Sequence, residues 1–271
     1  MTVTRWAAAA AVPALLIPLL AGGPRAGTAG DPNRTCLVTS VPLYSQAMWR
    51  AAAGTSPEAN VGIANWGSDP QNSAQGGPGT AKSAAGARQI ATAEKDGTRI
   101  LGYIDTNYGT SAAGFTTADI ETQMTDWHSW YGVTKFFLDL TPTATTGQPY
   151  YAALKSWAAA NISPAAAEWL NMGAYPAASS WTKDGAVIMD WEDSKAPSTP
   201  PGWVHNYPAS RFAMIMNAVP DTGAAIAAAV RDIENAHAGA GFVTSDHTYQ
   251  KLPGWSYWST FAGDAAGPGC T

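Results

Sequence analysis

Apolar and β-branched residues recur in eight short runs along the chain, each bounded by Gly, Pro, Asn or Asp. Several of these runs are almost continuously apolar, which is typical of strands that are buried on both faces. The pattern therefore predicts eight strands, at residues 36–44, 60–65, 99–106, 133–140, 168–176, 186–193, 211–220 and 239–247.

Segments with helical character lie between several of these runs. The clearest cover residues 80–97, 116–131, 149–160 and 221–237, whereas the connections after the first, fifth and sixth runs are shorter or rich in proline. Strands that alternate with helices favour a parallel α/β architecture, and eight of them favour a single (β/α)8 TIM-type barrel. A doubly wound open sheet is the alternative. No GxGxxG or Walker sequence follows any run, so no phosphate-binding loop is indicated.

Residues 1–29 have the pattern of a secretory signal peptide that precedes one domain at residues 30–271. An apolar run at residues 6–20 follows an early arginine and is followed by small residues. The run is too short for a comfortable membrane span, and two prolines interrupt it. We therefore expect cleavage after Ala29 and a secreted, monomeric protein with no stable membrane span. An uncleaved membrane anchor is the alternative.

The chain has only two cysteines, Cys36 and Cys270, near opposite ends of the predicted domain. In an exported protein two thiols are expected to pair, so the sequence predicts a disulfide. Such a bridge requires the two ends of the domain to lie together, which suits a closed architecture. Free buried thiols are the alternative.

The composition excludes several kinds of partner. Among 271 residues there are 15 Lys and Arg against 20 Asp and Glu, a formal net charge of −5, and the basic residues form no cluster. Nucleic acid is therefore not expected as a partner. The four histidines show neither HxH nor HExxH spacing, so neither a metal nor another cofactor is expected. Only 13% of the residues are charged, whereas 12 are Trp, whose flat rings suit both cores and stacking on ligands.

Two acids stand at predicted strand ends, where the active sites of such barrels lie. Asp139 follows the apolar residues KFFL, and Glu192 follows IMDW. Glycoside hydrolysis uses two carboxyl groups, and an apolar neighbourhood can raise the pKa of one of them. We interpret Asp139 and Glu192 as a candidate catalytic pair. For each acid, capping of the following helix or turn is the alternative.

Aromatic and polar residues gather at the same predicted strand ends. Flat rings there can stack on sugar faces while neighbouring polar groups bind hydroxyls. The candidate substrate-binding residues are Asn65, Trp66, Tyr103, Thr106, Tyr108, Tyr175, Trp191, Asn217, Asp246 and Trp258. For any single ring, packing in the core or in a loop is the alternative.

Seven stretches of the sequence resemble the spherulin-4 (spherulation-specific family 4) proteins and occur in that family's order. They are Asn65 with the later GGPG (76–79), ILGYIDTNYG (100–109), DIETQMTDWHSWYGVTKFFLD (119–139), NMGAYP (171–176), KDGAVIMDWEDS (183–194), GFVTSD (241–246) and KLPGWSYW (251–258). They span nearly the whole predicted domain, and the blocks ILGYIDTNYG and FFLD are the most specific.

The resemblance implies a (β/α)8 barrel related to glycoside hydrolases that act on galactosamine-containing exopolysaccharide. Members of known activity resemble endo-acting enzymes that cut α-1,4-linked N-acetylgalactosamine. Asp139 and Glu192 match the family acids after the fourth and sixth strands. Many members have a second acid directly after the first of these, where this chain has Leu140. Other matched family positions are Asn65, Tyr103, Thr106, Tyr108, Asp184 and Asp246.

The expected function is therefore a secreted glycoside hydrolase with a polysaccharide substrate. We favour Glu192 as the proton donor and Asp139 as the nucleophile or as the group that orients a substrate acetamide. Two alternatives remain: a non-catalytic carbohydrate-binding or cell-surface protein that keeps the cleft, and a secreted carbohydrate esterase or deacetylase.

Overall fold

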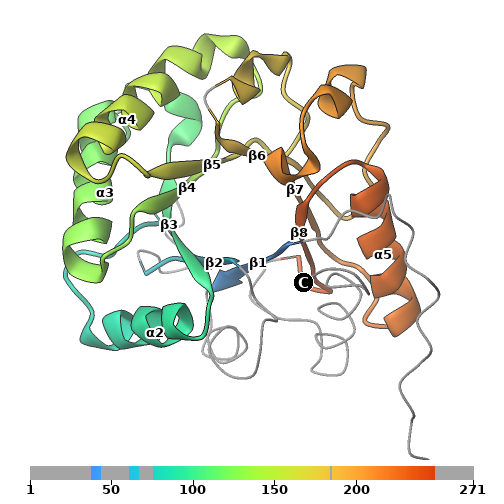
Figure 1. The fold of residues 1–271 in the computed structure, drawn as a ribbon, viewed down its shortest axis with the longest axis horizontal. Helices are drawn as coiled ribbons and strands as arrows, with labels where there is room; N and C mark the ends of the chain where they lie inside the picture. The colour runs from blue at the N-terminus through green and yellow to red at the C-terminus, as the bar shows by residue number, and fades with distance from the viewer. Residues whose placement is uncertain (1–37, 44–60, 67–75, 184, 248–271) are drawn as a thin grey trace, which may run out of the picture.

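Eight parallel strands follow one another in chain order around a barrel, and β8 pairs with β1 (Figure 1). The computed structural model describes residues 38–43 (backbone only), 61–66, 76–183 and 185–247. The strands are β1 (Val38–Leu43), β2 (Val61–Ala64), β3 (Arg99–Asp105), β4 (Lys135–Asp139), β5 (Ala167–Asn171), β6 (Val187–Asp193), β7 (Phe212–Met216) and β8 (Ala240–Val243). Because a doubly wound sheet reverses its strand order at a switch point, this sequential order excludes that alternative.

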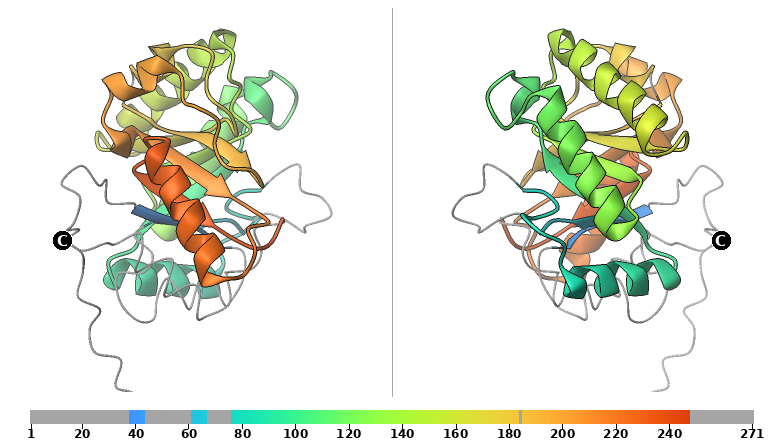
Figure 2. Two further views of the ribbon diagram at one scale, coloured as in Figure 1. Left: turned by 90° about the vertical axis from the view of Figure 1, so that its right-hand side faces the viewer. Right: turned by 90° about the vertical axis from the view of Figure 1, so that its left-hand side faces the viewer.

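The helices of the described residues pack on the outside of the strands (Figures 1 and 2). They are α2 (Ala84–Lys95), α3 (Thr117–Tyr131), α4 (Gln148–Asn161) and α5 (Gly223–Asn235), and short 3-10 helices, among them η3 (Ser179–Thr182) after β5, form other connections. The predicted parallel α/β class and the four predicted helices are thus confirmed. Within the described part of the chain, no helix is both long and apolar enough to cross a membrane.

Helix α3 shows how local sequence places an element against the barrel. It begins with a capping box, in which the side chains of Thr116 and Asp119 each accept the other's backbone N–H, and it ends at Gly132 with φ 76°. A Cβ atom on Gly102 in β3 would lie 2.7 Å from the ring of Trp127, so only glycine allows this close approach. The indole N–H of Trp127 then donates to the backbone oxygen of Tyr103 at 3.0 Å, which ties α3 to β3.

Strands β5 and β7 end earlier than their predicted ranges, 168–176 and 211–220. β5 stops at Asn171 because its side-chain oxygen accepts the N–H of Gly173, at φ 62°, in a tight turn. β7 stops at Met216, and Ala218 beyond it also has a positive φ, 51°. The predicted strand extensions are therefore wrong, and the residues after Asn171 belong to a loop at the barrel mouth.

A β-bulge in β6 decides which way Glu192 points. The register between β6 and β7 shifts between Met189 and Trp191, so Asp190 is an extra residue without a partner on β7. Because side chains alternate between the two faces of a strand, an extra residue reverses the alternation beyond it. Glu192 consequently faces the barrel interior together with Met189, whereas a regular strand would have turned it outward.

Asp190 itself is fully buried, and in the described part of the chain neither of its carboxyl oxygens has a hydrogen-bond partner. Burial raises the pKa of Asp190 well above its usual range, and its own backbone N–H opposes this only in part. A buried carboxylate without partners would cost much free energy, so the burial of Asp190 favours its neutral carboxyl form.

We predict that Asp190→Asn makes stability less dependent on pH. The folded protein keeps a proton on Asp190 that the unfolded chain loses above about pH 4. The contribution of Asp190 to the free energy of unfolding is therefore full at acidic pH. That contribution is lost as the pH rises through the higher folded-state pKa. The variant should therefore gain unfolding temperature relative to wild type between pH 4 and neutral pH, measured by circular dichroism. A constant difference in unfolding temperature across this range would contradict the prediction.

Candidate active site

Four successive strands bring polar side chains together at the carboxyl end of the barrel interior. Asp105 ends β3 and pairs in register with Asp139, which ends β4. Asn171 ends β5, and its amide nitrogen donates to Asp139 Oδ1 and to Glu192 Oε2, both at 2.7 Å. The two carboxyl oxygens that share this nitrogen therefore lie at most 5.4 Å apart, twice the 2.7 Å bond length. The structure thus brings together the two acids predicted as a pair.

The orientation of the Asn171 amide is fixed by the turn that follows it. Its oxygen accepts the Gly173 N–H at 3.1 Å, so its nitrogen must face the carboxyl groups. The Gly173 backbone oxygen in turn accepts the N–H of Glu192 at 3.1 Å. One turn therefore positions both the amide and the backbone of Glu192. Asn171 is 8% exposed, whereas both acids are only half-buried and remain open to a ligand.

Asp139 has further donors. The Tyr103 hydroxyl donates to its Oδ2 at 2.5 Å, and the backbone N–H of Leu140 also bonds the carboxylate. Burial raises the pKa of Asp139, while the hydrogen bonds from Tyr103, Leu140 and Asn171 favour the charged form and oppose this rise. Asp139 is the last residue of β4, and Leu140 lies just beyond the strand with φ 52°. Of Asp139 and Leu140, it is therefore Asp139 whose side chain the strand directs into the barrel mouth.

Thr106 is fully buried, which corrects its prediction as a substrate-binding residue. Its hydroxyl donates to the backbone oxygen of Asp139 at 2.6 Å and lies 2.7 Å from the Tyr151 hydroxyl. Burial raises the pKa of Tyr151 to about 12, so its phenol stays neutral. Thr106 therefore supports the strand end that carries Asp139 and does not face a ligand.

Asp105 is a buried carboxyl group that is not among the predicted site residues. Its Oδ1 accepts the N–H of Asn107 at 2.8 Å, and the residue is 3% exposed. Burial raises the pKa of Asp105 to about 6; the Asn107 bond opposes the rise, and the nearby charge of Asp139 adds to it. Asn107 and Tyr108 follow with φ 43° and 61°, a costly left-handed conformation. This conformation leaves Tyr108 56% exposed at the rim.

Tyr175 and Trp191 form a pair of rings with centroids 5.9 Å apart. The Tyr175 hydroxyl donates to the backbone oxygen of Ser198 at 3.1 Å, and the Trp191 indole donates to that of Lys195 at 3.1 Å. Their polar atoms thus hold the connection between β6 and β7 in place, and only the ring faces are left for a ligand.

The ring of Trp66 belongs to a packing layer, which is the alternative given for any single ring, and its role in substrate binding stays a prediction. It contacts the rings of Trp127 and Tyr131 at centroid distances of 6.3 and 6.2 Å and lies against Gly86 of α2. The neighbouring side chain of Asn65 accepts the Gly77 N–H at 3.0 Å. Trp66 therefore packs against α2 and α3.

The other predicted residues are at strand ends or outside the described part. Asn217 follows β7 and is 8% exposed, and Asp246 follows β8 half-buried. Trp258, both cysteines of the predicted disulfide and residues 1–29 lie outside the described residues, as does Asp184. Their roles stay predictions.

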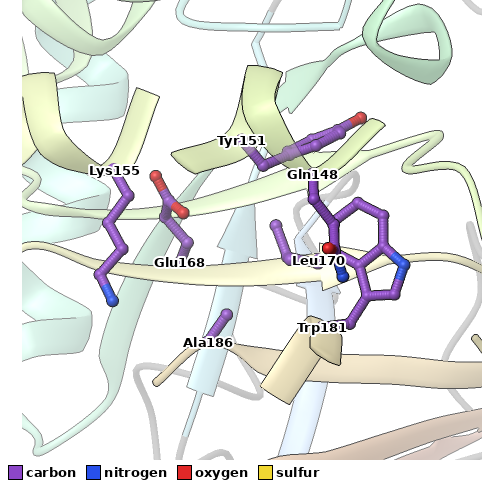
Figure 3. Close-up of a pocket in the computed structure, with 7 residues that line it drawn as sticks. All are labelled: Gln148, Tyr151, Lys155, Glu168, Leu170, Trp181 and Ala186. Carbon is purple, nitrogen blue, oxygen red and sulfur yellow. The ribbon is translucent and has the colours of Figure 1, made fainter. Parts of the chain in front are cut away.

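A small cavity lies elsewhere, between α4 and the outward face of β5 (Figure 3). It is lined by Gln148, Tyr151, Lys155, Glu168, Leu170, Trp181 and Ala186. None of the predicted site residues lines it, so it is separate from the carboxylate site. Among the described residues, no group of three His, Cys, Asp or Glu could hold a metal ion.

Comparisons with solved structures identify folds of the same kind. Sph3 of Aspergillus clavatus, solved in complex with GalNAc, matches with a TM-score of 0.65 and 18% identity over 85% of this chain and 98% of Sph3. A candidate chitinase A from Streptomyces coelicolor matches with a TM-score of 0.52 and 8% identity over 84% of this chain and 98% of that one. Haloferax volcanii malate synthase, as a lead(II) complex, matches with a TM-score of 0.51 and 10% identity over 89% of this chain and 75% of the synthase.

At these identities the structural likeness shows the fold alone. No curated protein sequence matches the chain. The family model gives the more specific result, because it covers most of the chain and includes every one of the four strand ends that form the carboxylate site. The spherulation-specific family 4 (Spherulin4) model matches residues 49–265, and the chain belongs to this family.

Proposed function

We propose that the protein is an exported glycoside hydrolase that cleaves galactosamine-containing polysaccharide, with Asp139 and Glu192 as its catalytic pair. The observation that carries the proposal is the Asn171 amide, which holds the two carboxyl groups at most 5.4 Å apart. Membership of the family and the likeness to Sph3, solved with GalNAc, support the class of substrate. The signal-like residues 1–29 support an extracellular polymer as the target.

The separation of the two acids favours a retaining mechanism. Retaining glycosidases place their carboxyl groups about 5 to 5.5 Å apart, whereas inverting enzymes need about 6.5 to 9.5 Å to admit a water. Glu192 gives its proton to the glycosidic oxygen as the bond to the anomeric carbon breaks. Asp139 attacks that carbon, or orients a substrate acetamide that does so. A water then completes the hydrolysis and returns a proton to Glu192.

The surroundings of the two acids suit these roles. Burial raises the pKa of Asp139, and the hydrogen bonds from three donors oppose this rise, which supports the ionised form that a nucleophile needs. The exposed ring of Tyr108 at the rim offers a face for a sugar next to the carboxyl groups. We propose internal cleavage of α-1,4-linked N-acetylgalactosamine as the reaction.

The first prediction concerns the reaction itself. Purified protein incubated with galactosaminogalactan should generate new reducing ends, and the first product should keep the α configuration when followed by proton NMR. Asp139→Asn and Glu192→Gln should each lower the rate by at least about 10³-fold, because each removes one half of the pair.

Three outcomes of this experiment would contradict the proposal. Binding of the polymer without any cleavage would favour the non-catalytic carbohydrate-binding alternative. Cleavage that survives both substitutions would exclude Asp139 and Glu192 as the catalytic pair. Release of acetate without chain scission would point to the esterase alternative.

Asn171→Leu should lower kcat by about 10²-fold. Because the leucine also loses the bond to the Gly173 N–H, folding of the variant is checked by circular dichroism. The leucine removes the donor between two acids, so their positions relax and the pKa of Asp139 rises. The acid side of the pH–rate profile should therefore move to higher pH. Asn161→Leu is the matched control, because Asn161 is exposed at the carboxyl end of α4 and, among the described residues, its side chain bonds only the Trp157 backbone oxygen. Equal kcat in both variants would contradict the role of Asn171.

Asp105→Asn should move the acid side of the same profile to lower pH. The charge of Asp139 raises the pKa of Asp105. Because repulsion between two like charges is reciprocal, a charge on Asp105 should in turn oppose the ionisation of Asp139. Asparagine keeps the shape of the side chain but carries no charge, and Asp139 should then ionise more easily. The measurement is kcat/KM between pH 4 and pH 8. A shift to higher pH would show that the repulsion does not control this ionisation.

A further inference from the structure

Residues 76–78 pass over the Tyr103 ring with no space for a side chain. A Cβ atom on Gly76 would lie 2.2 Å from Tyr103 Cε1 and 2.6 Å from Asn65 Nδ2. Such distances do not occur for real Cβ atoms, so the backbone of Gly76 fills the whole gap between the ring and the amide. Gly76 is itself buried. Glycine at this position therefore permits a contact that no other residue would allow.

The Tyr103 ring has little freedom to move away from this contact. The ring stacks on Phe137 with centroids 5.9 Å apart and is only 8% exposed. Its hydroxyl donates to Asp139 Oδ2 at 2.5 Å, and its backbone oxygen accepts the Trp127 indole N–H. Gly76 thus covers one side of a ring that is already held at its hydroxyl and at its backbone.

The segment is anchored independently of the ring. The Gly77 N–H donates to Asn65 Oδ1 at 3.0 Å, and the Gly77 oxygen accepts the Trp66 N–H at 2.9 Å. The Tyr131 hydroxyl, from α3, donates to the Pro78 oxygen at 3.3 Å and accepts the Ser83 N–H at 2.9 Å. The position of residues 76–78 is therefore set by the end of β2 and by α3, not by Asp139.

We propose that residues 76–78 are a positioning element for the candidate nucleophile, in which the Gly76 backbone holds the Tyr103 ring so that its hydroxyl bonds Asp139. This inference rests on the proposed function for its catalytic meaning. The contact between Gly76 and Tyr103 and the bond between Tyr103 and Asp139 form one chain of physical contacts. Gly76 acts through Tyr103 and touches none of the reacting atoms.

Gly76→Ala is the direct test, and Gly223→Ala is its matched control. The added methyl group of the first variant meets the Tyr103 ring, whereas that of the second, at the start of α5, meets nothing within 4 Å. We expect Gly76→Ala to lower kcat by about 10- to 100-fold with KM nearly unchanged, because a small displacement of a reacting group has effects of this size. Gly223→Ala should keep the wild-type kcat.

A second readout does not need catalytic activity. The Asp139 carboxyl carbon, labelled with ¹³C, is titrated by NMR in each variant. Loss of the Tyr103 hydrogen bond removes a contact that favours the charged form, so the pKa of Asp139 should rise in Gly76→Ala and in Tyr103→Phe. In the double variant Gly76→Ala/Tyr103→Phe the two rises in the pKa of Asp139 should not add, because both act through the bond between Tyr103 and Asp139.

If Gly76→Ala does not fold, as judged by circular dichroism, Tyr131→Phe decides the question. It loosens the anchor of residues 76–78 from α3 without crowding Tyr103, and it should raise the pKa of Asp139 in the same direction by a smaller amount. An Asp139 pKa equal to that of wild type in every folded variant of residues 76 and 131 would overturn the inference. Full additivity of the two pKa changes in the double variant Gly76→Ala/Tyr103→Phe would overturn it as well. If wild-type protein does not cleave the polymer, the proposed function fails, and the titration still tests the positioning element.

Discussion

The hydrogen bonds from one amide nitrogen to two carboxyl groups are the constraint on which the barrel mouth depends. Asp139 and Glu192 would repel each other at this distance if both were charged and nothing lay between them. The Asn171 amide nitrogen donates one hydrogen bond to each carboxyl group, and the Asn171 oxygen is held by the Gly173 N–H in the turn. The early end of β5 and the turn that follows it are therefore needed to place this donor.

Two further features of the backbone serve the same arrangement. The bulge at Asp190 reverses the alternation of β6, so that Glu192 points inward and reaches the Asn171 amide. It leaves the carboxyl group of Asp190 buried with no hydrogen-bond partner among the described residues, a cost that is lower for the neutral form that burial favours. The positive φ values of Tyr108 and Leu140 lie at the ends of β3 and β4. Local strain of this kind is common at functional sites, where the surrounding structure must maintain it.

Much of this organisation was predictable from the pattern of residues. Asp139 and Glu192 could be found because each directly follows an apolar run that ends at the barrel mouth. Asn171 was missed because the apolar pattern continues to residue 176, which places a strand-ending asparagine inside a predicted strand. A polar residue amid an apolar run was the available signal. Thr106 was assigned to the mouth from its position in the sequence, yet tertiary packing buries it completely.

The sequence by itself determined the parallel α/β class, the helices and the membership of the spherulation-specific family, because periodicity and motifs depend on neighbours along the chain. Only the tertiary structure decided which polar groups meet. The Asn171 amide joins three strands, and the Gly76 contact joins the end of β2 to Tyr103 of β3 and through it to Asp139 of β4. Such contacts depend on strand register, on one inserted residue in β6 and on the close approach of backbone to a ring. The register, the inserted residue and the close approach follow from how strands and loops pack against one another. No local pattern of hydrophobic and polar residues specifies that packing.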